Sequence, residues 1–270
     1  MFDKILVPTD FSAVSYNALH YAVQMALRHQ ARLVLLHVCK TGLVSIIHND
    51  AKEAEAMRKM RRTQADINAQ YPNLPEIEIK VLHARGVSDE IVRYANRIKA
   101  SAVVMGFKGS RDDPRSTLGK NTLEVIMRCP RPVFSIPKGA SFQPYQKIAY
   151  TNYNSRTENT NFNTVVKLAE AYQAEIIILR TRSKREEENF DPARNLFSHK
   201  KNIFKYQNIR KEYVGTDDLK EGTRIFTQNE LPELMALGIH DERFFYEMVL
   251  ELYRKDIAFE QNIPLMSNVI

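Results

Sequence analysis

The chain has 270 residues, more than the about 100–200 of a usual single domain, and its hydrophobic fraction of 44% is ample for one or two packed cores. Its formal net charge is +7, but many of the basic residues lie in helical stretches that also contain acidic residues, such as Lys52–Glu55. This mixing favours solvated helix faces over a nucleic-acid partner. Neither of the two cysteines, Cys39 and Cys129, has a second thiol or a histidine at metal-ligand spacing, which argues against a disulfide framework and a zinc site.

The first predicted elements are a short apolar strand and an amphipathic helix. The strand covers Lys4–Pro8, and the helix runs from about Ser12, whose hydroxyl suits an N-cap, to Arg28. The chain thus begins with a strand and not with the regions of a signal peptide. No window approaches the about 18 consecutive apolar residues of a membrane span. We therefore expect a soluble, cytoplasmic protein without a membrane partner.

Apolar strands and amphipathic helices then alternate through the first half of the chain. The further strands are predicted at Arg32–Val38, Glu76–Leu82, Ala102–Met105 and Pro132–Pro137. The further helices are predicted at Asn49–Gln70, from Gly86 or Ser88 to about Lys99, and at Thr117–Arg128. This alternation predicts a parallel sheet, and the uninterrupted apolar residues of the last two strands are typical of strands buried on both faces.

A break in this pattern divides the chain. The segment Lys138–Pro144 contains glycine, serine and proline, and a new strand begins at Lys147. We therefore predict two domains, over residues 1–139 and 145–270. The second includes Arg180–Lys211, which is rich in positive charge but is interrupted by acidic residues and lacks regularly spaced aromatic residues. We still expect no nucleic-acid partner.

The second half of the sequence repeats the first at constant spacing. Lys4-Ile5 aligns with Lys147-Ile148, and Gln30-Ala31 aligns with Gln173-Ala174 without a gap. At one smaller offset Gly106 matches Gly238, as if residues between had been deleted. These matches indicate duplication. The alternative is the alternation that any two α/β domains share, and it stays open.

Two spaced glycines follow the fourth predicted strand, and a third precedes a helix. They are Gly106, Gly109 and Gly119, the last followed by Lys120-Asn121-Thr122. Glycine permits positive φ and close approach of the backbone, and a helix N-terminus favours anions. This arrangement suits phosphate capture, and we expect any larger residue at Gly106 or Gly119 to crowd the ligand.

The Gly-x2-Gly-x9-Gly spacing resembles that of ATP-binding members of the universal stress protein family. The resemblance extends to Ile5–Ser12, Leu35–Val38 and Cys129–Val133, and so covers the whole first half. It implies an α/β fold of two tandem Rossmann-like domains, similar to adenine nucleotide alpha hydrolases. Each domain would be a five-stranded parallel sheet of order 3-2-1-4-5 with helices on both faces.

The resemblance also implies where a ligand would bind. Asp10 and the Val38 backbone would lie near adenine and ribose, and the three glycines would line the phosphates. The full implied set is Pro8, Thr9, Asp10, Val38, Met105, Gly106, Gly109, Gly119, Lys120 and Asn121. The implied cofactor is ATP or another adenine nucleotide, with magnesium left open.

Lys120 departs from the family pattern, which has serine or threonine at this position. A lysine can reach a β- or γ-phosphate as a point charge, or it can point to solvent on the first helical turn and leave binding weakened. The loop Arg111–Arg115 is open to two interpretations as well: it closes over phosphates, or it is an ordinary surface loop. His37 is interpreted as a structural strand-end residue, with a hydrogen bond to ligand as the alternative.

The second half lacks the glycine loop. By the repeat, Tyr153 replaces Asp10, Asp241 replaces Gly109 and Glu251 replaces Gly119, and the acids would repel a triphosphate. The resemblance to family dimers implies that the two fifth strands, Pro132–Ile136 and Pro264–Ile270, pair within the chain as an intramolecular pseudo-dimer. A further homodimer is left open.

Three functions follow from these patterns. The first is a universal stress protein that binds an adenine nucleotide in its first domain and has a stress-response or signalling role. The alternative is a scaffold or protein-interaction module in which both domains are degenerate. An enzyme is the third, but no catalytic base lies beside the inferred phosphates, so we expect at most slow ATP hydrolysis.

Overall fold

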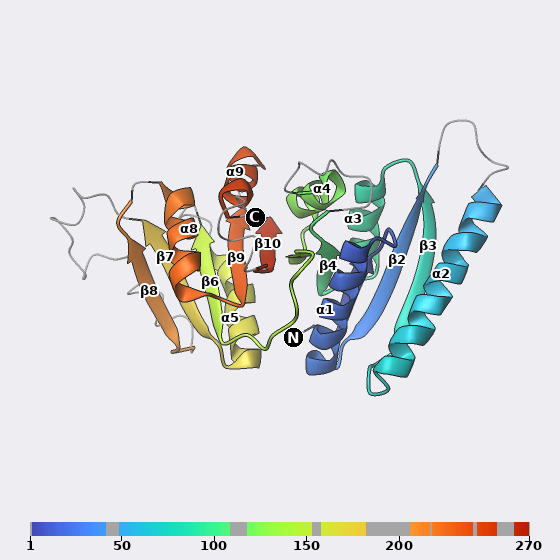
Figure 1. Cartoon of the computed structure of the whole chain (residues 1–270), viewed down its shortest axis with the longest axis horizontal. Helices are drawn as coiled ribbons and strands as arrows, with labels where there is room; N and C mark the ends of the chain where they lie inside the picture. Colours follow the sequence, from blue (N-terminus) through green and yellow to red (C-terminus); the bar gives the residue numbers. More distant parts are fainter. Residues whose placement is uncertain are drawn as a thin grey trace. The chain divides into compact units, whose positions relative to one another are not determined.

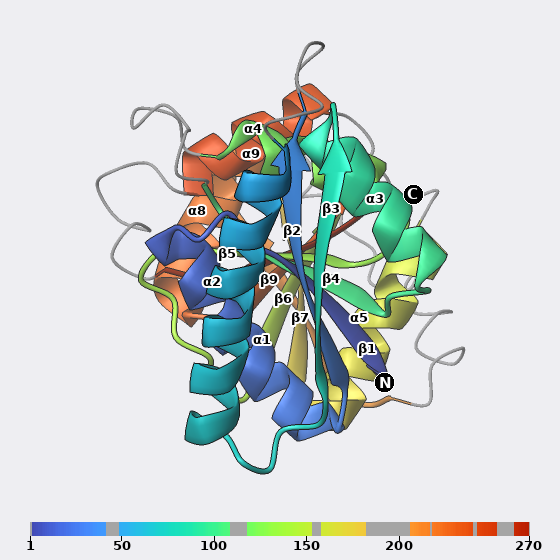
Figure 2. The same ribbon diagram turned by 90° about the vertical axis from the view of Figure 1, so that its right-hand side faces the viewer.

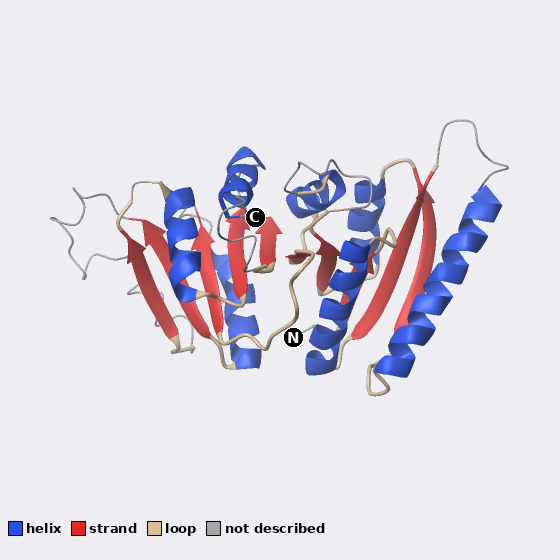
Figure 3. Cartoon of the chain, viewed as in Figure 1, coloured by secondary structure: helices blue, strands red, loops and turns tan. Residues whose placement is uncertain are grey.

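The computed structural model describes residues 2–41, 49–108, 118–152, 158–181, 206–216, 218–239, 242–252 and 262–269. The chain forms two compact units, one built on residues 1–142 together with 267–269, and one built on residues 143–266. Each unit is an α/β structure, coloured along the chain in Figure 1 and by secondary structure in Figure 3. No helix in the described ranges is both long and apolar enough to cross a membrane.

The first unit contains a parallel sheet in the order β3-β2-β1-β4-β5. Every neighbouring pair in this order is parallel. The strands are β1 (Lys4–Pro8), β2 (Arg32–Lys40), β3 (Ile77–Ala84), β4 (Ala102–Gly106) and β5 (Val133–Ile136). All residues of β4 and β5 are buried, as the uninterrupted apolar runs predict. The expected fold class and strand order are therefore confirmed.

Helices cover both faces of this sheet (Figure 2). They are α1 (Ala13–His29), α2 (Asn49–Gln70), α3 (Val87–Arg97) and α4 (Lys120–Arg128). On one face α1 contacts α2, where the hydroxyl of Tyr16 donates to Thr63 Oγ1 at 3.3 Å. On the other face α3 contacts α4, where Arg128 pairs with Asp89.

Local chemistry sets the limits of these elements. The Ser12 hydroxyl accepts a hydrogen bond from the Ser15 amide at 3.2 Å, so the predicted N-cap of α1 is confirmed. The helix predicted from Thr117 begins only at Lys120, because the backbone of Gly119 is extended, with φ of −70° and ψ of 143°, and its amide donates to the Phe107 carbonyl at 2.8 Å. The strand predicted to end at Val38 continues to Lys40, because β3 runs beside it to the end.

The second unit has the same alternation of strands and helices. Its elements are β6 (Lys147–Asn152), α5 (Glu158–Tyr172), β7 (Glu175–Thr181), β8 (Ile209–Val214), α8 (Leu219–Glu230), β9 (Leu234–Ile239), α9 (Glu242–Leu252) and β10 (Leu265–Val269). The order is β8-β7-β6-β9, with β10 next to β9. The pairs β6–β7, β6–β9 and β7–β8 are parallel. This is again the order 3-2-1-4-5.

Hydrogen bonds recur at equivalent places in the two units. The Ala31 amide donates to Ala26 at the end of α1, and the Ala174 amide donates to Ala169 at the end of α5. The residue after each of these helices, Gln30 or Gln173, has a positive φ. Such equivalences are what a duplicated domain predicts. Four expectations stay predictions: the duplication, the domain limits 1–139 and 145–270, the pairing of the two fifth strands, and a homodimer.

The end of β4 packs very closely on the start of α1. A Cβ atom added to Gly106 would lie 2.8 Å from Val14 Cγ1 and 3.1 Å from the Val14 carbonyl carbon and oxygen. Real Cβ atoms are essentially never found as close as 2.8 Å to another heavy atom and are seldom found at 3.1 Å, and the Val14 backbone cannot rotate away as a side chain can. A glycine at position 106 therefore lets β4 and α1 approach each other.

Gly106→Ala should destabilise the first unit by about 1–3 kcal/mol, the usual cost of overpacking a core. Urea unfolding of the full chain, followed by circular dichroism, measures the change. Adding Val14→Ala should restore part of the loss, since it removes the 2.8 Å contact but not the two main-chain contacts. Stability equal to that of the wild type would show that Gly106 has no packing role.

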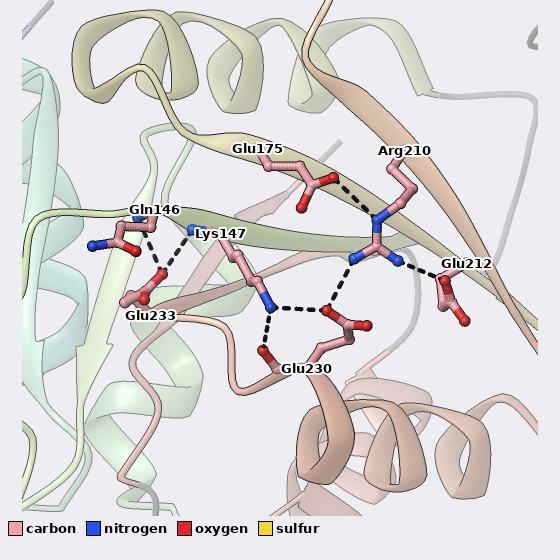
Figure 4. Close-up of polar contacts among 7 residues, drawn as sticks. All are labelled: Gln146, Lys147, Glu175, Arg210, Glu212, Glu230 and Glu233. Atoms are coloured by element: carbon pink, nitrogen blue, oxygen red, sulfur yellow. Dashed lines mark hydrogen bonds and ion pairs between the residues drawn. The ribbon is translucent and has the colours of Figure 1, made fainter.

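A network of ion pairs lies at the amino ends of the strands in the second unit (Figure 4). Arg210 contacts Glu175 at 3.0 Å, Glu212 at 2.6 Å and Glu230 at 2.9 Å. Lys147 Nζ lies 3.0 Å from a Glu230 carboxylate oxygen and donates to the Glu230 carbonyl. The hydrogen bond from Lys147 lowers the pKa of Glu230, and Arg210 lowers this pKa further. The network thus joins the end of α8 to β6, β7 and β8.

Glu230→Gln should lower the free energy of unfolding of the second unit by about 1 kcal/mol at pH 7, since partial exposure lets solvent screen the pairs. The folded-state pKa of Glu230 lies below its ordinary value of 4.5. The stabilisation is therefore present above that value and is lost as the pH falls through the lowered pKa. Urea unfolding at pH 7 and pH 3 should show a smaller difference between the proteins at pH 3 than at pH 7.

Glu55→Gln provides the control for this measurement. Glu55 also pairs with a lysine, Lys59, but both side chains are more than half exposed. This variant should unfold like the wild type. An equal effect of the two substitutions would mean that the network contributes no more than an ordinary surface ion pair.

Candidate functional site

The candidate site lies at the carboxyl ends of β1 and β4. From β1 the chain crosses to β2 on one side, and from β4 it crosses to β5 on the other side. The strand order reverses between β1 and β4, and ligands of open α/β sheets bind in the crevice beyond such a reversal. Pro8 ends β1, and the buried Met105 and Gly106 end β4, so these three predicted residues meet at this edge.

The turn after β1 is held by its own polar side chains. The Thr9 amide donates to the Leu36 carbonyl at 2.8 Å, which continues the ladder with β2. Thr9 Oγ1 accepts from the Phe11 amide at 3.1 Å, and Asp10 Oδ1 accepts from the Ser12 amide at 3.0 Å. Asp10 is exposed. The carboxylate therefore shapes the turn while it faces solvent at the edge of the sheet.

Phe11 adopts an unusual backbone conformation in this turn. Its φ is 63°, a value that bulky residues rarely adopt. Its ring packs on the ring of His37, with the two ring centroids 4.6 Å apart. Lys59, on α2, places its Nζ 5.4 Å from the centroid of the Phe11 ring. Sequence reasoning did not select Phe11, because no pattern in the sequence signals a positive φ at a phenylalanine.

His37 fixes the same turn from β2. Its Nδ1 lies 2.8 Å from the Thr9 carbonyl oxygen. Since a carbonyl only accepts, Nδ1 carries the hydrogen and donates it. This contact supports the interpretation of His37 as a structural strand-end residue, and it gives the residue a part in positioning the Thr9–Ser12 turn.

The backbone groups of Val38 lie on the edge of β2 that faces β1, beyond the point where β1 ends. The last β1–β2 pair is Pro8 with Leu36, whereas β2 continues to Lys40 beside β3. The Leu36 carbonyl points toward β1, because it accepts from Thr9. Backbone groups two residues apart in a strand point the same way, so the amide and carbonyl of Val38 point to the side of the crevice.

The start of α4 is fixed against the end of β4. The Gly119 amide donates to the Phe107 carbonyl at 2.8 Å, and the Thr122 hydroxyl donates to the Gly106 carbonyl at 2.9 Å. Gly119 is the N-cap, with no side chain to bond the first amides, and the first turn of α4 contains no acidic residue. The amides of Lys120 and Asn121 therefore have no partner within the helix.

The structure gives each of two glycines a backbone setting of its own, and their contact with a ligand stays a prediction. A larger residue at Gly106 would crowd Val14 of α1, as described above, so the glycine is explained by packing of the protein on itself. Gly119 has φ of −70° and ψ of 143°, an extended conformation open to any residue. It does not use the positive φ that glycine permits. Gly109 and the loop Arg111–Arg115 lie outside the described residues, and their roles stay predictions.

Lys120 extends along the outside of α4. Its side chain is 84% exposed, and Nζ lies 3.8 Å from Glu124 Oε1. Glu124 also accepts a hydrogen bond from the Ser88 hydroxyl on α3. Of the two interpretations of Lys120, this position matches the one in which the lysine points to solvent on the first helical turn. Asn121 is exposed beside it.

The second unit differs from the first at the equivalent edge. Between β4 and α4 lie residues 107–119, whereas only residues 240–241 separate β9 from α9. Glu251 lies in the last turn of α9 and not at its start. The second unit therefore has a shorter connection at this edge, and the expected correspondence of Gly119 with Glu251 is wrong, because Gly119 precedes its helix and Glu251 lies near the end of one. Tyr153 and Asp241 lie outside the described residues.

No metal centre is formed by the side chains of the described residues. Within those ranges no group of three or more histidine, cysteine, aspartate or glutamate residues could hold an ion. Both Cys39 and Cys129 are buried thiols, and burial raises the pKa of each.

Comparisons with known proteins agree with this fold. The sequence matches the model of the universal stress protein family over residues 1–137, just over half of the chain. Universal stress protein MJ0531 of Methanocaldococcus jannaschii is 27% identical over 150 residues, which cover 51% of this chain and 84% of that protein.

Solved structures match both units. A universal stress protein from Archaeoglobus fulgidus has a TM-score of 0.69 at 14% identity and covers 99% of this chain and 95% of its own. A functionally unknown protein from Pseudomonas aeruginosa has a TM-score of 0.63 at 12% identity, and the match covers 99% of this chain and 92% of that protein's chain. Likenesses at such identities show the fold alone. Since the family model spans more than half of the sequence, the chain belongs to the universal stress protein family.

Proposed function

We propose that the first unit binds ATP or another adenine nucleotide and that the chain serves a stress-response or signalling role through this binding. The observation that carries the proposal is the start of α4. It has no capping side chain and no acidic residue in its first turn, and it is anchored beside the ends of β1 and β4. The phosphates would lie against this helix start.

The electrostatics of α4 favour an anion there. Aligned peptide dipoles place about half a positive charge at a helix N-terminus, and the first amides lack partners within the helix. Lys120 adds a full positive charge at the first helical position. The amides of Lys120 and Asn121 are donors for phosphate oxygens, and Gly109 and Gly119 would keep the approach open.

The turn after β1 suits the nucleoside. The Asp10 carboxylate is exposed at the edge of the sheet and accepts hydrogen bonds of the kind that ribose hydroxyls donate. The Val38 backbone offers one donor and one acceptor toward the crevice, which matches the N1 acceptor and the N6 donor of adenine. Pro8, Thr9 and Met105 would line the space between. Magnesium, if it accompanies the nucleotide, would be held chiefly by the phosphates.

A second candidate function is a protein-interaction module without a nucleotide. Two observations favour it: Gly106 is explained by its contact with Val14, and Lys120 is paired with Glu124. Neither needs a ligand. The second unit would be degenerate under both proposals, because too few residues separate β9 from α9 to form a phosphate loop.

Calorimetric titration of the nucleotide-stripped full chain with ATP tests the proposal. We expect one ATP per chain, bound by the first unit. Gly119→Val should weaken binding by about tenfold or more, since a branched side chain would stand where the helix amides meet the phosphates; tenfold corresponds to about 1.4 kcal/mol.

Gly139→Val is the matched control. Gly139 is exposed in the connection after β5, and its substitution should leave the affinity for ATP unchanged. Wild-type protein that takes up no adenine nucleotide at millimolar concentration would refute nucleotide binding and favour the interaction module. Equal affinities of wild type and Gly119→Val would place the ligand elsewhere.

A further inference from the structure

We infer that Pro8 is a positioning residue that keeps β1 and β4 unpaired at their carboxyl ends, and so keeps main-chain groups of β4 open to the ligand. The inference rests on the proposed nucleotide binding. The observation that carries it is a difference in strand pairing between the two units, at the edge where a ligand would bind.

The pairing of β1 with β4 stops before either strand ends. The last pair is Leu6 with Val103, whereas the strands continue to Pro8 and Gly106. On the other side of β1 the ladder with β2 runs on to Pro8, which is paired with Leu36. The end of β1 is therefore held on the side of β2 and is not paired on the side of β4.

The equivalent strands of the second unit pair farther along. The ladder of β6 with β9 continues through Thr151, which is paired with Leu237, to Asn152, which is paired with Gly238. In the alignment of the two halves Thr151 stands where the first unit has Pro8. Strand pairing in the second unit thus occupies the place that stays open in the first.

The missing amide hydrogen of proline explains this difference. The Lys4 carbonyl accepts from the Ser101 amide at 2.8 Å, so the backbone groups of the even-numbered residues of β1 point toward β4. After Leu6, the next donor toward β4 would be the amide at position 8, and its acceptor would be the Val104 carbonyl. Proline has no hydrogen to donate, whereas the threonine of the second unit has one.

The position of this proline in the sheet is itself unusual. Prolines in sheets occur mainly on edge strands, because elsewhere they remove a ladder hydrogen bond. In contrast, β1 lies between β2 and β4, and Pro8 is buried. The ladder bond that it removes lies at the carboxyl ends of the strands, the edge at which ligands of such sheets bind.

The open end directs main-chain groups of β4 toward the crevice. The Phe107 amide donates to the Ile136 carbonyl of β5 at 2.9 Å, so the adjacent Gly106 directs its amide to the opposite side, toward β1. Val104, two residues earlier, directs its carbonyl the same way, and both groups lie beyond the last β1–β4 pair. A ribose hydroxyl can donate to the carbonyl, and a phosphate oxygen can accept from the amide. Strand pairing would use the same two groups, so it would compete with the ligand.

Pro8→Thr and Pro8→Ala in the full chain test the inference. Both supply the absent amide: threonine as in the second unit, and alanine with a smaller side chain. Without nucleotide, the extended ladder should slow hydrogen exchange of the Gly106 amide. In calorimetry both variants should bind ATP about tenfold more weakly, since the ligand must then displace hydrogen bonds between the strands. AMP should lose affinity equally, because the closure does not involve the β- and γ-phosphates.

Pro132→Thr is the matched control. Pro132 precedes β5 at the amino ends of the strands of the same sheet, away from the candidate site. Its substitution also removes a proline from the unfolded chain, so it reproduces that effect on stability. It should change neither the affinity for nucleotides nor the exchange of the Gly106 amide. Thermal unfolding without nucleotide checks that each variant folds.

Thr151→Pro makes the reverse change in the second unit, and it does not depend on the folding of the Pro8 variants. The ladder of β6 with β9 should then end early, and the Gly238 amide should exchange faster than in the wild type. Unchanged exchange would contradict the role given to the amide at this strand position.

The outcomes separate this inference from the proposed function. Wild-type protein that binds neither nucleotide refutes nucleotide binding, and the inference falls with it. Wild-type protein that binds ATP, with both Pro8 variants binding equally well, refutes the inference alone. A loss of affinity without slower exchange at Gly106, or a loss in Pro8→Thr but not in Pro8→Ala, would also refute it, because the effect would then not come from pairing of the strands.

Discussion

The anchoring of α4 to the end of β4 is the constraint on which the candidate site depends. The Thr122 hydroxyl bonds the Gly106 carbonyl, and the Phe107 carbonyl accepts from the Gly119 amide. Both bonds use groups that a strand end or a helix start would otherwise leave unpaired. They fix the direction of the helix axis relative to β4. The first amides of α4 and the positive end of its dipole therefore have a set position beside the turn after β1.

In their described residues the two units differ at the carboxyl ends of their strands. At the amino ends the contacts are kept: Lys4 Nζ donates to the Ile98 carbonyl, and Lys147 Nζ donates to the Glu230 carbonyl. Beyond β9 the chain has no room for a counterpart of residues 107–119. Ligands of such sheets bind at the carboxyl ends. A change at that edge can alter a binding site while it leaves in place the contacts that hold the sheet together.

The elements were predicted well from the sequence because their signals are local. Helix α2 has the predicted limits, Asn49–Gln70, since charged exposed residues surround a narrow apolar stripe that ends before a proline. The contacts at the site were predicted less well. The close contact between Gly106 and Val14 joins residues far apart in the sequence. In the sequence alone, a glycine at the end of a strand is as compatible with a phosphate contact as with such a packing contact. The positive φ of Phe11 depends on the hydrogen bond to Thr9 and the packing on His37.

Lys120 changes the chemistry available at the helix start. The serine or threonine usual in the family offers a neutral hydroxyl, and the next hydroxyl along α4, that of Thr122, already donates to Gly106. The lysine therefore does not restore a short-range donor; it supplies a charge on a long side chain, whose attraction to phosphate reaches farther and is weakened by salt. Such a charge is unfavourable at a helix N-terminus, and the ion pair with Glu124 within α4 offsets part of this repulsion. An anion bound at the helix start would act on the lysine in the same sense.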